Sequence, residues 1–157
     1  MAHPGGPAAC GATVDPKAAL RRLNEVRIRG ATCPGGATWR AAPLSWSDSL
    51  AFAAQFQARE MARLERMSHV DGQNRGLAER LRASGYRFGT AVENVDVGYP
   101  SLDAIVDAWL ESEGHCENLL NPAVLEVGLA CMDAGSTGSP VERRYWTLVL
   151  GSPRASR

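Results

Sequence analysis

Apolar residues recur three or four positions apart in the first third of the chain, and this spacing predicts two helices. Asp15 can cap the first helix, Pro16 suits its first position, and Gly30 ends it. Ser47 can cap a second and longer helix over about residues 48–66. The apolar stripes that the helices would bury are Ala19, Leu20, Leu23 and Val26 in the first and Leu50, Ala54, Met61 and Leu64 in the second.

The same spacing predicts two further helices in the middle of the chain. One covers about residues 73–84, and Gly85 suits the left-handed residue that stops a helix. The other begins at Pro100-Ser101 and should stop near Gly114. Its single apolar face consists of Leu102, Ile105, Val106 and Trp109.

Strand patterns lie between and after these helices. A valine-rich strand is predicted over residues 90–99, and two short apolar strands over residues 124–132 and 145–151. The Gly/Ser loop at residues 135–140 favours antiparallel pairing of the last two strands. Residues 148–150 are continuously apolar, so the last strand should lie between two layers. Helices first and strands mostly late favour an α+β fold or a layered α/β/α sandwich, not a doubly wound dinucleotide fold.

A chain of 157 residues, 45% apolar and 22% charged, fits one globular domain. We expect a largely irregular N-terminal tail over residues 1–14, a single domain over 15–153, and a short tail over 154–157. The 17 basic and 17 acidic residues leave no net charge, which argues against nucleic acid or an anionic lipid surface as a partner. No apolar run approaches the ~20 residues of a membrane helix, so no integral membrane segment is expected.

Four cysteines, Cys10, Cys33, Cys116 and Cys131, form two groups far apart in the sequence. No Cys-x-x-Cys occurs, which argues against a zinc ribbon or a thioredoxin-like site. Of three possible pairings we favour the local one, Cys10–Cys33 with Cys116–Cys131; the alternative is four free thiols in a cytosolic protein. Because the N-terminus lacks a signal-peptide pattern, disulfides imply a secreted or periplasmic protein whose signal has been removed.

Two histidines lie inside the predicted domain, and each follows a predicted helix. His69 stands in Met67-Ser68-His69-Val70-Asp71-Gly72, and His115 stands in Ser112-Glu113-Gly114-His115-Cys116. Histidines at the ends of elements can point into a shared cleft more easily than histidines on a core stripe. Taken alone, each has a simpler interpretation as a surface or hydrogen-bonded structural histidine.

Six short motifs stand in order along the chain: Ser68-His69-x-Asp71-Gly72, Gly85-Tyr86, Glu93-Asn94, Trp109-x-x-Ser112-x-Gly114-His115-x-x-Asn118, Glu126-x-Gly128 and Tyr145-Trp146. Together they resemble the CAP superfamily of SCP-like, cysteine-rich secretory proteins, in particular its bacterial extracellular members. The likeness runs from about Leu20 to Gly151, and Asn24-Glu25-x-Arg27 and Leu44-x-Trp46 also resemble family positions. It implies a three-layer α/β/α sandwich with a central, mainly antiparallel sheet.

The resemblance also implies a cleft where two histidines and two acidic residues meet. Carried over by motif, His69, Glu93 and His115 are the candidate catalytic groups and metal ligands. In animal members the fourth group is an acid three residues after the helix tryptophan, a position that Ser112 occupies here, so Glu111 or Glu113 would have to replace it.

Two further positions depart from the family pattern. Val92 replaces a usual glycine, which a strand tolerates and a positive-φ turn does not. Cys116 follows His115 where bacterial members often have arginine. This resembles a subset in which that cysteine bonds the nearby strand cysteine, here Cys131, and the bond would tie the His115 segment to the sheet.

Two neutral imidazoles and one or two carboxylates can hold Zn²⁺ or another divalent cation with an open coordination position. Hydrolysis would need that opening for water, with Glu93 or its partner as general base. The same groups can also form a hydrogen-bonded network without metal. We therefore expect a secreted, non-catalytic binding module for a divalent cation, a lipid-like ligand or a protein or other macromolecular partner; a metal-dependent, protease-like hydrolase and a purely structural extracellular domain are the alternatives.

Overall fold

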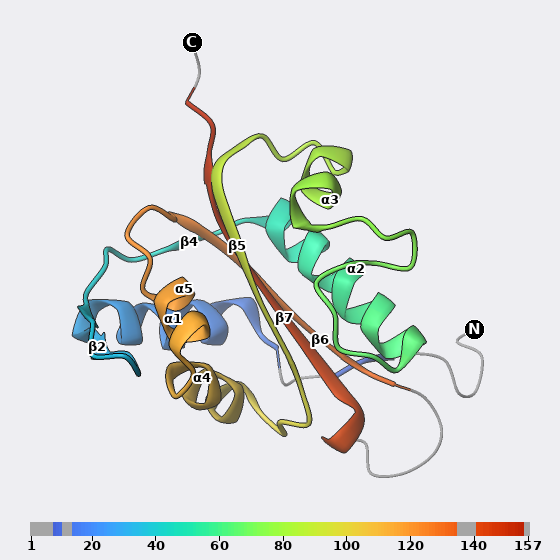
Figure 1. Cartoon of the computed structure of the whole chain (residues 1–157), viewed down its shortest axis with the longest axis horizontal. Helices are drawn as coiled ribbons and strands as arrows, with labels where there is room; N and C mark the ends of the chain where they lie inside the picture. The colour runs from blue at the N-terminus through green and yellow to red at the C-terminus, as the bar shows by residue number, and fades with distance from the viewer. Residues whose placement is uncertain (1–7, 11–13, 135–140, 156–157) are drawn as a thin grey trace.

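The computed structural model of the chain describes residues 8–10, 14–134 and 141–155 and shows a three-layer α/β/α sandwich (Figure 1). Helices α2 and α3 cover one side of the central sheet, while α1, α4 and α5 cover the other. The layered architecture predicted from the sequence is therefore confirmed. The helices are α1 (Pro16–Arg29), α2 (Asp48–Leu64), α3 (Leu77–Ala83), α4 (Leu102–Leu110) and α5 (Glu113–Leu119), with a 3₁₀ turn at Val141–Arg143.

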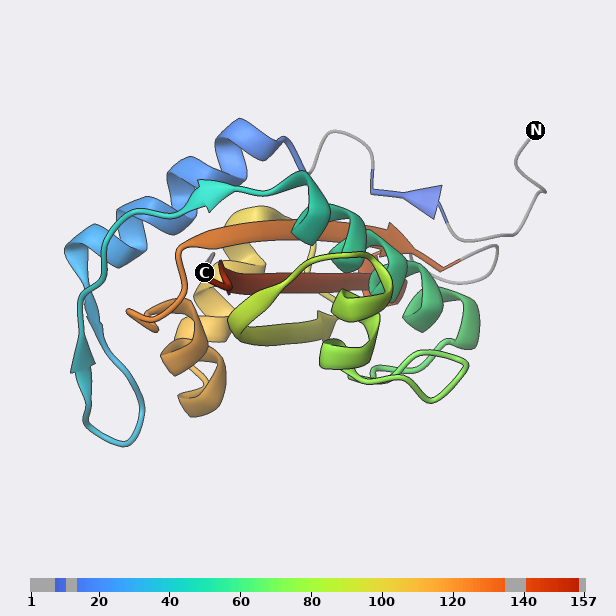
Figure 2. The ribbon, with the colours of Figure 1, turned by 90° about the horizontal axis from the view of Figure 1, so that it is seen from above.

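Three long strands run side by side in the sheet, with β7 between the other two (Figure 2). Both β6 and β5 pair antiparallel to β7, as predicted for the last two strands. Two short strands pair with the outer edge of β6: β1 antiparallel at one end and β4 parallel at the other. A separate hairpin joins β2 to β3. The strands are β1 (Ala8–Ala9), β2 (Ala31–Thr32), β3 (Thr38–Trp39), β4 (Ser45–Trp46), β5 (Phe88–Val97), β6 (Glu126–Asp133) and β7 (Arg144–Pro153).

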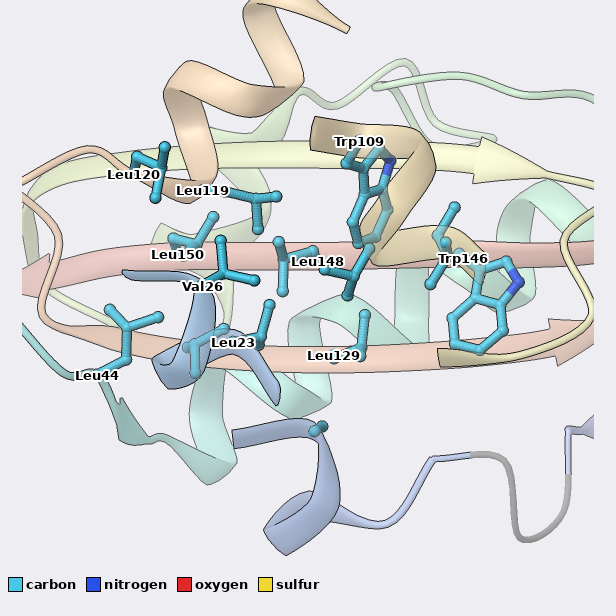
Figure 3. Packing of buried hydrophobic residues seen from close by; sticks show 14 of the residues in the cluster. Leu23, Val26, Leu44, Trp109, Leu119, Leu120, Leu129, Trp146, Leu148 and Leu150 are labelled. Atoms are coloured by element: carbon cyan, nitrogen blue, oxygen red, sulfur yellow. The ribbon is translucent and has the colours of Figure 1, made fainter. Parts of the chain in front are cut away.

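The central strand β7 is buried on both faces, as its continuous apolar run predicts. Side chains alternate across a strand, so Leu148 and Leu150 contribute to the core beneath α1, α4 and α5, and Val149 to the core beneath α2 and α3. Figure 3 shows Leu148 and Leu150 among Trp109, Leu119 and Leu23 in the first of these cores. The sandwich thus contains two apolar cores, one on each side of the sheet.

Close packing of α2 on the sheet explains the Glu126-x-Gly128 motif. A Cβ atom at Gly128 would lie 2.0 Å from the backbone nitrogen of Ala51 in α2, so only glycine permits this approach. Glu126, at the start of the same strand, accepts a 2.7 Å hydrogen bond from the Tyr86 hydroxyl. Both positions of this motif therefore hold neighbouring segments against β6.

The capping predictions for the first two helices are confirmed. The Asp15 carboxylate accepts a hydrogen bond from the Ala18 amide at the start of α1, and the Ser47 hydroxyl accepts one from the Leu50 amide at the start of α2. Gly85 has a φ of 83°, the left-handed conformation expected after α3.

The boundaries of the middle helices differ from the prediction. Helix α3 begins at Leu77, later than the predicted residue 73, because the Asp71 carboxylate accepts the amides of Gln73 and Arg75 and holds that segment as a loop. The helix predicted to stop near Gly114 ends at Leu110, and a separate helix, α5, follows it. His115 therefore lies in the first turn of α5.

The predicted disulfide pairing is wrong. Cys10 bonds Cys131, and Cys33 bonds Cys116. The first bond follows from the sheet, because Ala9 pairs with Met132 and so places Cys10 beside Cys131. The second fastens α5 to the turn of the β2–β3 hairpin, so this disulfide ties the His115 segment to that hairpin and not to the sheet. All four cysteines are bonded.

Arg27, one of the positions that resemble the family, is a buried structural residue. Its side chain on α1 donates hydrogen bonds of 2.8–3.1 Å to four backbone carbonyls, those of Ala42, Leu119, Asn121 and Val124. Burial of the guanidinium lowers the pKa of Arg27 to about 10. Arg27 therefore joins α1 to the loops before β4 and β6.

Candidate functional site

The candidate site is built on β5, which forms one edge of the main sheet. Neighbouring side chains of a strand point to opposite faces. Glu93 accordingly faces α3, where it contacts Arg80, and Asn94 faces α5, where it contacts the His115 carbonyl. The motif Glu93-Asn94 thus connects the helical layers on the two sides of the sheet.

On the α3 side, Glu93 lies at the centre of a cluster of polar groups. Its carboxylate contacts the Arg80 Nη2 at 2.9 and 3.0 Å and accepts a hydrogen bond from the His69 Nδ1 at 3.0 Å. The side chains of Glu93 and Arg80 are only 2% and 3% exposed, whereas that of His69 is 58% exposed. The structure therefore brings His69 and Glu93 together as predicted by motif, with His69 at the surface.

The loop that carries His69 is held from both sides. The buried side chain of Gln57 on α2 donates hydrogen bonds to the carbonyls of Ser68 and Val70, which flank the histidine. Arg80 also donates to the His69 carbonyl at 3.0 Å. These bonds fix the backbone around His69, so its ring position does not depend on the Glu93 contact alone.

On the α5 side, two asparagines connect His115 to the sheet. Asn94 donates a 3.1 Å hydrogen bond to the carbonyl of His115. Asn118 lies one turn further along α5 and donates to the Asn94 side chain at 2.9 Å. The spacing His115-x-x-Asn118 therefore places both residues of α5 against the Glu93-Asn94 pair on β5.

The pKa values of the two histidines are shifted in opposite directions from the ordinary value. The hydrogen bond with Glu93 raises the pKa of His69, while burial lowers the pKa of His115. Neighbouring charges also affect the pKa of each histidine: Glu93 and Arg80 act on His69, and Asp96 and His69 act on His115. The charge of Asp96 favours the protonated form of His115 and that of His69 disfavours it, which places all three in one electrostatic neighbourhood.

These directions give a testable prediction. In a proton NMR titration of the His3→Ala variant, which removes the third imidazole, His69 should titrate above 6.5 and His115 below it. Glu93→Gln should return the pKa of His69 toward 6.5, because the ionised partner is lost. The His69–Glu93 contact should stabilise the fold fully at pH values below the unfolded-state pKa and less as pH rises through the folded-state pKa. Equal pKa values for the two histidines would contradict this assignment.

The predicted ligands do not form a ready-made three-ligand site. Among the described residues, His69, Glu93 and His115 do not bring three ligand atoms within 4.8 Å of one another. The candidates for the fourth position give no better set. Glu111 is exposed, and the Glu113 carboxylate lies against Gly35 in the β2–β3 hairpin, where a Cβ would meet its Oε1 at 2.6 Å. Of the predicted ligands, only His69 and Glu93 are in direct contact through their side chains.

Sequence reasoning missed two charged residues of the candidate site. Arg80 was not predicted as a site residue, because its segment resembles the solvent-exposed face of a short helix. The segment is Leu77-Ala78-Glu79-Arg80-Leu81. A signal was present, because Arg80 follows Leu77 by three positions and precedes Leu81, and so shares their buried stripe. Asp96 was missed because it lies outside the motif; its position two residues after Asn94 places it on the same face of β5.

A sequence model described as "CAP: Cysteine-rich secretory protein family" matches residues 20–150. The chain belongs to the CAP family. That match covers the segments that carry His69, Glu93 and His115, and it confirms the resemblance inferred from the six motifs.

Curated relatives of this CAP domain come from Bacillus subtilis. YkwD is 28% identical over 94 residues, which cover 60% of this chain and 37% of the relative. The membrane protein YlbC is 31% identical over 106 residues, which cover 68% of this chain and 28% of the relative. The chain thus spans about a third of the length of the curated relatives it matches.

Solved structures show the same fold. An extracellular protein of Bacillus anthracis that contains an SCP domain aligns with a TM-score of 0.67 at 24% identity, over 86% of this chain and 39% of the other. An outer surface protein of Borrelia burgdorferi aligns with a TM-score of 0.74 at 17% identity, over 96% and 99% of the two chains. Both neighbours are extracellular or surface proteins by description. Within the part of this chain that the structure describes, no helix is long and apolar enough to cross a membrane.

Proposed function

We propose that this chain is a secreted, non-catalytic CAP domain that binds a divalent cation, such as Zn²⁺, through His69 and His115. The disulfides support secretion, because disulfides persist in oxidising compartments. The choice of binding over hydrolysis rests on Glu93. Its carboxylate is buried, and both of its oxygens already have partners.

A general base for hydrolysis must reach the water whose proton it takes. The Glu93 carboxylate instead contacts Arg80 through both oxygens and His69 through one, and its side chain is 2% exposed. A carboxylate held in this way is not free to activate a water molecule. This supports a binding module in preference to the metal-dependent hydrolase.

The same contact suits His69 to cation binding. Because the Glu93 carboxylate accepts the hydrogen of Nδ1, the neutral ring keeps its lone pair on Nε2, which is the arrangement of metal-binding histidines with a carboxylate behind them. Burial lowers the pKa of His115, which favours the neutral form that binds metal. A bound cation would supply a positive charge between the two imidazoles, and the chain would supply the two nitrogen ligands.

Other ligands considered for the cleft receive less support. A lipid-like ligand needs an apolar lining, whereas the groups gathered at this edge of β5 are imidazole, carboxylate, guanidinium and amide. A macromolecular partner or a purely structural role would be consistent with the fold but is not favoured by any contact of the cleft. The cation therefore remains the proposal that uses the observed chemistry.

Zinc binding should raise the melting temperature. At free Zn²⁺ about a hundredfold above Kd, the stabilisation is about 2.7 kcal/mol, which corresponds to a rise of about 5–10 °C for a domain of this size. Differential scanning calorimetry of the His3→Ala variant with increasing Zn²⁺ measures this rise with only two imidazoles present.

Single replacements then locate the effect. His69→Ala and His115→Ala in the same background should each remove most of the rise, because each deletes one of two nitrogen ligands. The wild type, in which His3 is intact, serves as the matched control and should show the full rise in melting temperature with Zn²⁺. No rise at saturating Zn²⁺, or a full rise in the variant that lacks both His69 and His115, would refute the proposed function.

A further inference from the structure

A concave site lies between α2 and α3, on the side of the sheet that also carries Arg80. It is a pocket of about 130 Å³. Phe52, Ala53, Phe56, Arg75, Arg80, Ala83 and Ser84 line it. Neither His69 nor His115 is among these residues, so the pocket is separate from the proposed cation ligands although Arg80 contributes to both.

Two arginines, Arg75 and Arg80, are among the residues that line the pocket. Arg80 uses Nη2 for Glu93 and His69, while its Nε and Nη1 are buried and have no hydrogen-bond partner among the described residues. Arg75 uses Nε for the Asp71 carboxylate. Among the described residues, no carboxylate lines the pocket. Because buried donors without acceptors cost free energy, an anionic group that accepts from these guanidiniums would be favoured there.

The remaining walls are apolar and aromatic. Phe56 lies beneath the guanidinium of Arg75, with 5.7 Å between the ring centroid and the Arg75 Cζ. Phe52 is 63% exposed, so its ring is accessible to a ligand. An apolar cavity of about 150 Å³ accepts one benzene ring, so a pocket of about 130 Å³ can take up most of a single ring and is too small to enclose a long acyl chain.

We propose that this pocket binds a small aromatic carboxylate. The ring would lie against Phe52 and Phe56, and the carboxylate would accept hydrogen bonds from the guanidiniums of Arg75 and Arg80. Aromatic rings gain from packing on other rings as well as from burial, and a carboxylate forms strong, charge-assisted bonds with arginine. The charge of the arginines and the size of the pocket thus favour the same class of ligand. This site is additional to the proposed cation site.

The test uses phenylacetate as the probe, followed in ¹H–¹⁵N NMR spectra that include the arginine Nε–H signals. We expect phenylacetate to shift the signals of α2 and α3 and the Nε–H of Arg80, with an affinity at least tenfold higher than that of acetate or 2-phenylethanol. Acetate carries the charge without the ring, and 2-phenylethanol carries the ring without the charge. Equal affinity for phenylacetate and either partial analogue, or no shift with phenylacetate, would overturn the proposal.

Variants separate the pocket from the cleft. Arg75→Gln removes a charge, and Ala83→Leu fills space without changing a charge; each should weaken phenylacetate binding at least fivefold. Arg82→Gln is the matched control on α3, because Arg82 does not line the pocket. His69→Ala should leave phenylacetate binding unchanged, so the result does not depend on whether the cation proposal holds. Unchanged affinity in both pocket variants would place the ligand elsewhere and refute the site.

Discussion

Replacement of Arg80 by methionine is expected to lower the free energy of unfolding by about 3–5 kcal/mol, the usual cost of removing one partner of a buried ion pair. Arg80→Met keeps much of the side-chain volume but leaves the Glu93 carboxylate, 2% exposed, without its cation. Urea denaturation followed by circular dichroism measures the loss directly.

Two controls identify the ion pair as the cause. Arg82→Met on the same helix replaces an exposed arginine whose guanidinium lies over the Phe88 ring, and it should cost less than about 1 kcal/mol. The double variant Arg80→Met with Glu93→Leu removes both charges and should recover much of the stability, since the loss comes from an unpaired buried charge. A double variant as unstable as the sum of the two single variants would show that the charges do not interact.

Removal of the Cys33–Cys116 disulfide should have an effect of similar size. The bond closes a sequence separation of 83 residues, for which the chain-entropy relation gives about 4–5 kcal/mol of stabilisation. The double variant Cys33→Ala with Cys116→Ala should therefore unfold at a much lower urea concentration. It should also weaken Zn²⁺ binding, because Cys116 follows His115 in α5 and the bond holds that helix.

The second disulfide offers a matched comparison. Cys10–Cys131 closes a separation of 121 residues and fastens β1 to β6, away from α5. Its removal through Cys10→Ala with Cys131→Ala should cost a similar free energy but leave the affinity of the folded protein for Zn²⁺ unchanged. Equal loss of Zn²⁺ affinity in both double variants would mean that α5 does not depend on its own disulfide.

The sheet and the long helices could be predicted because local patterns decide them. The run Leu148-Val149-Leu150 has no polar face, and β7 accordingly lies between two layers. The caps Asp15 and Ser47 mark the starts of α1 and α2 by bonds within a few residues of the chain. Such signals need no knowledge of distant contacts.

The errors arose where distant contacts decide the structure. The predicted disulfides joined cysteines that are close in the sequence. In the structure, the pairing of β1 with β6 brings Cys10 to Cys131. Helix α5 was not separated from α4 because glycine at position 114 is a poor helix former, and the second helix depends on its disulfide and on the asparagine contacts with β5.

The candidate site was predictable in part, and only through family motifs. His69 and Glu93 were placed together by motif, and they do form a hydrogen bond. The helical spacing indicates that Arg80 shares the buried stripe of its helix, but the sequence alone could not show that its partner is Glu93, which lies on a strand 13 residues further along the chain. That contact changes the interpretation of Glu93 from a reactive group to one that orients His69.

The two short strands on the outer edge of β6 have a consequence for aggregation. An exposed edge strand is a template on which another chain can add a strand. Here β4 occupies residues 126 and 127 of that edge, and β1 occupies residues 132 and 133. Few backbone groups on this side of β6 are left for a foreign strand, so the two short strands protect this edge of the sheet from intermolecular β-pairing.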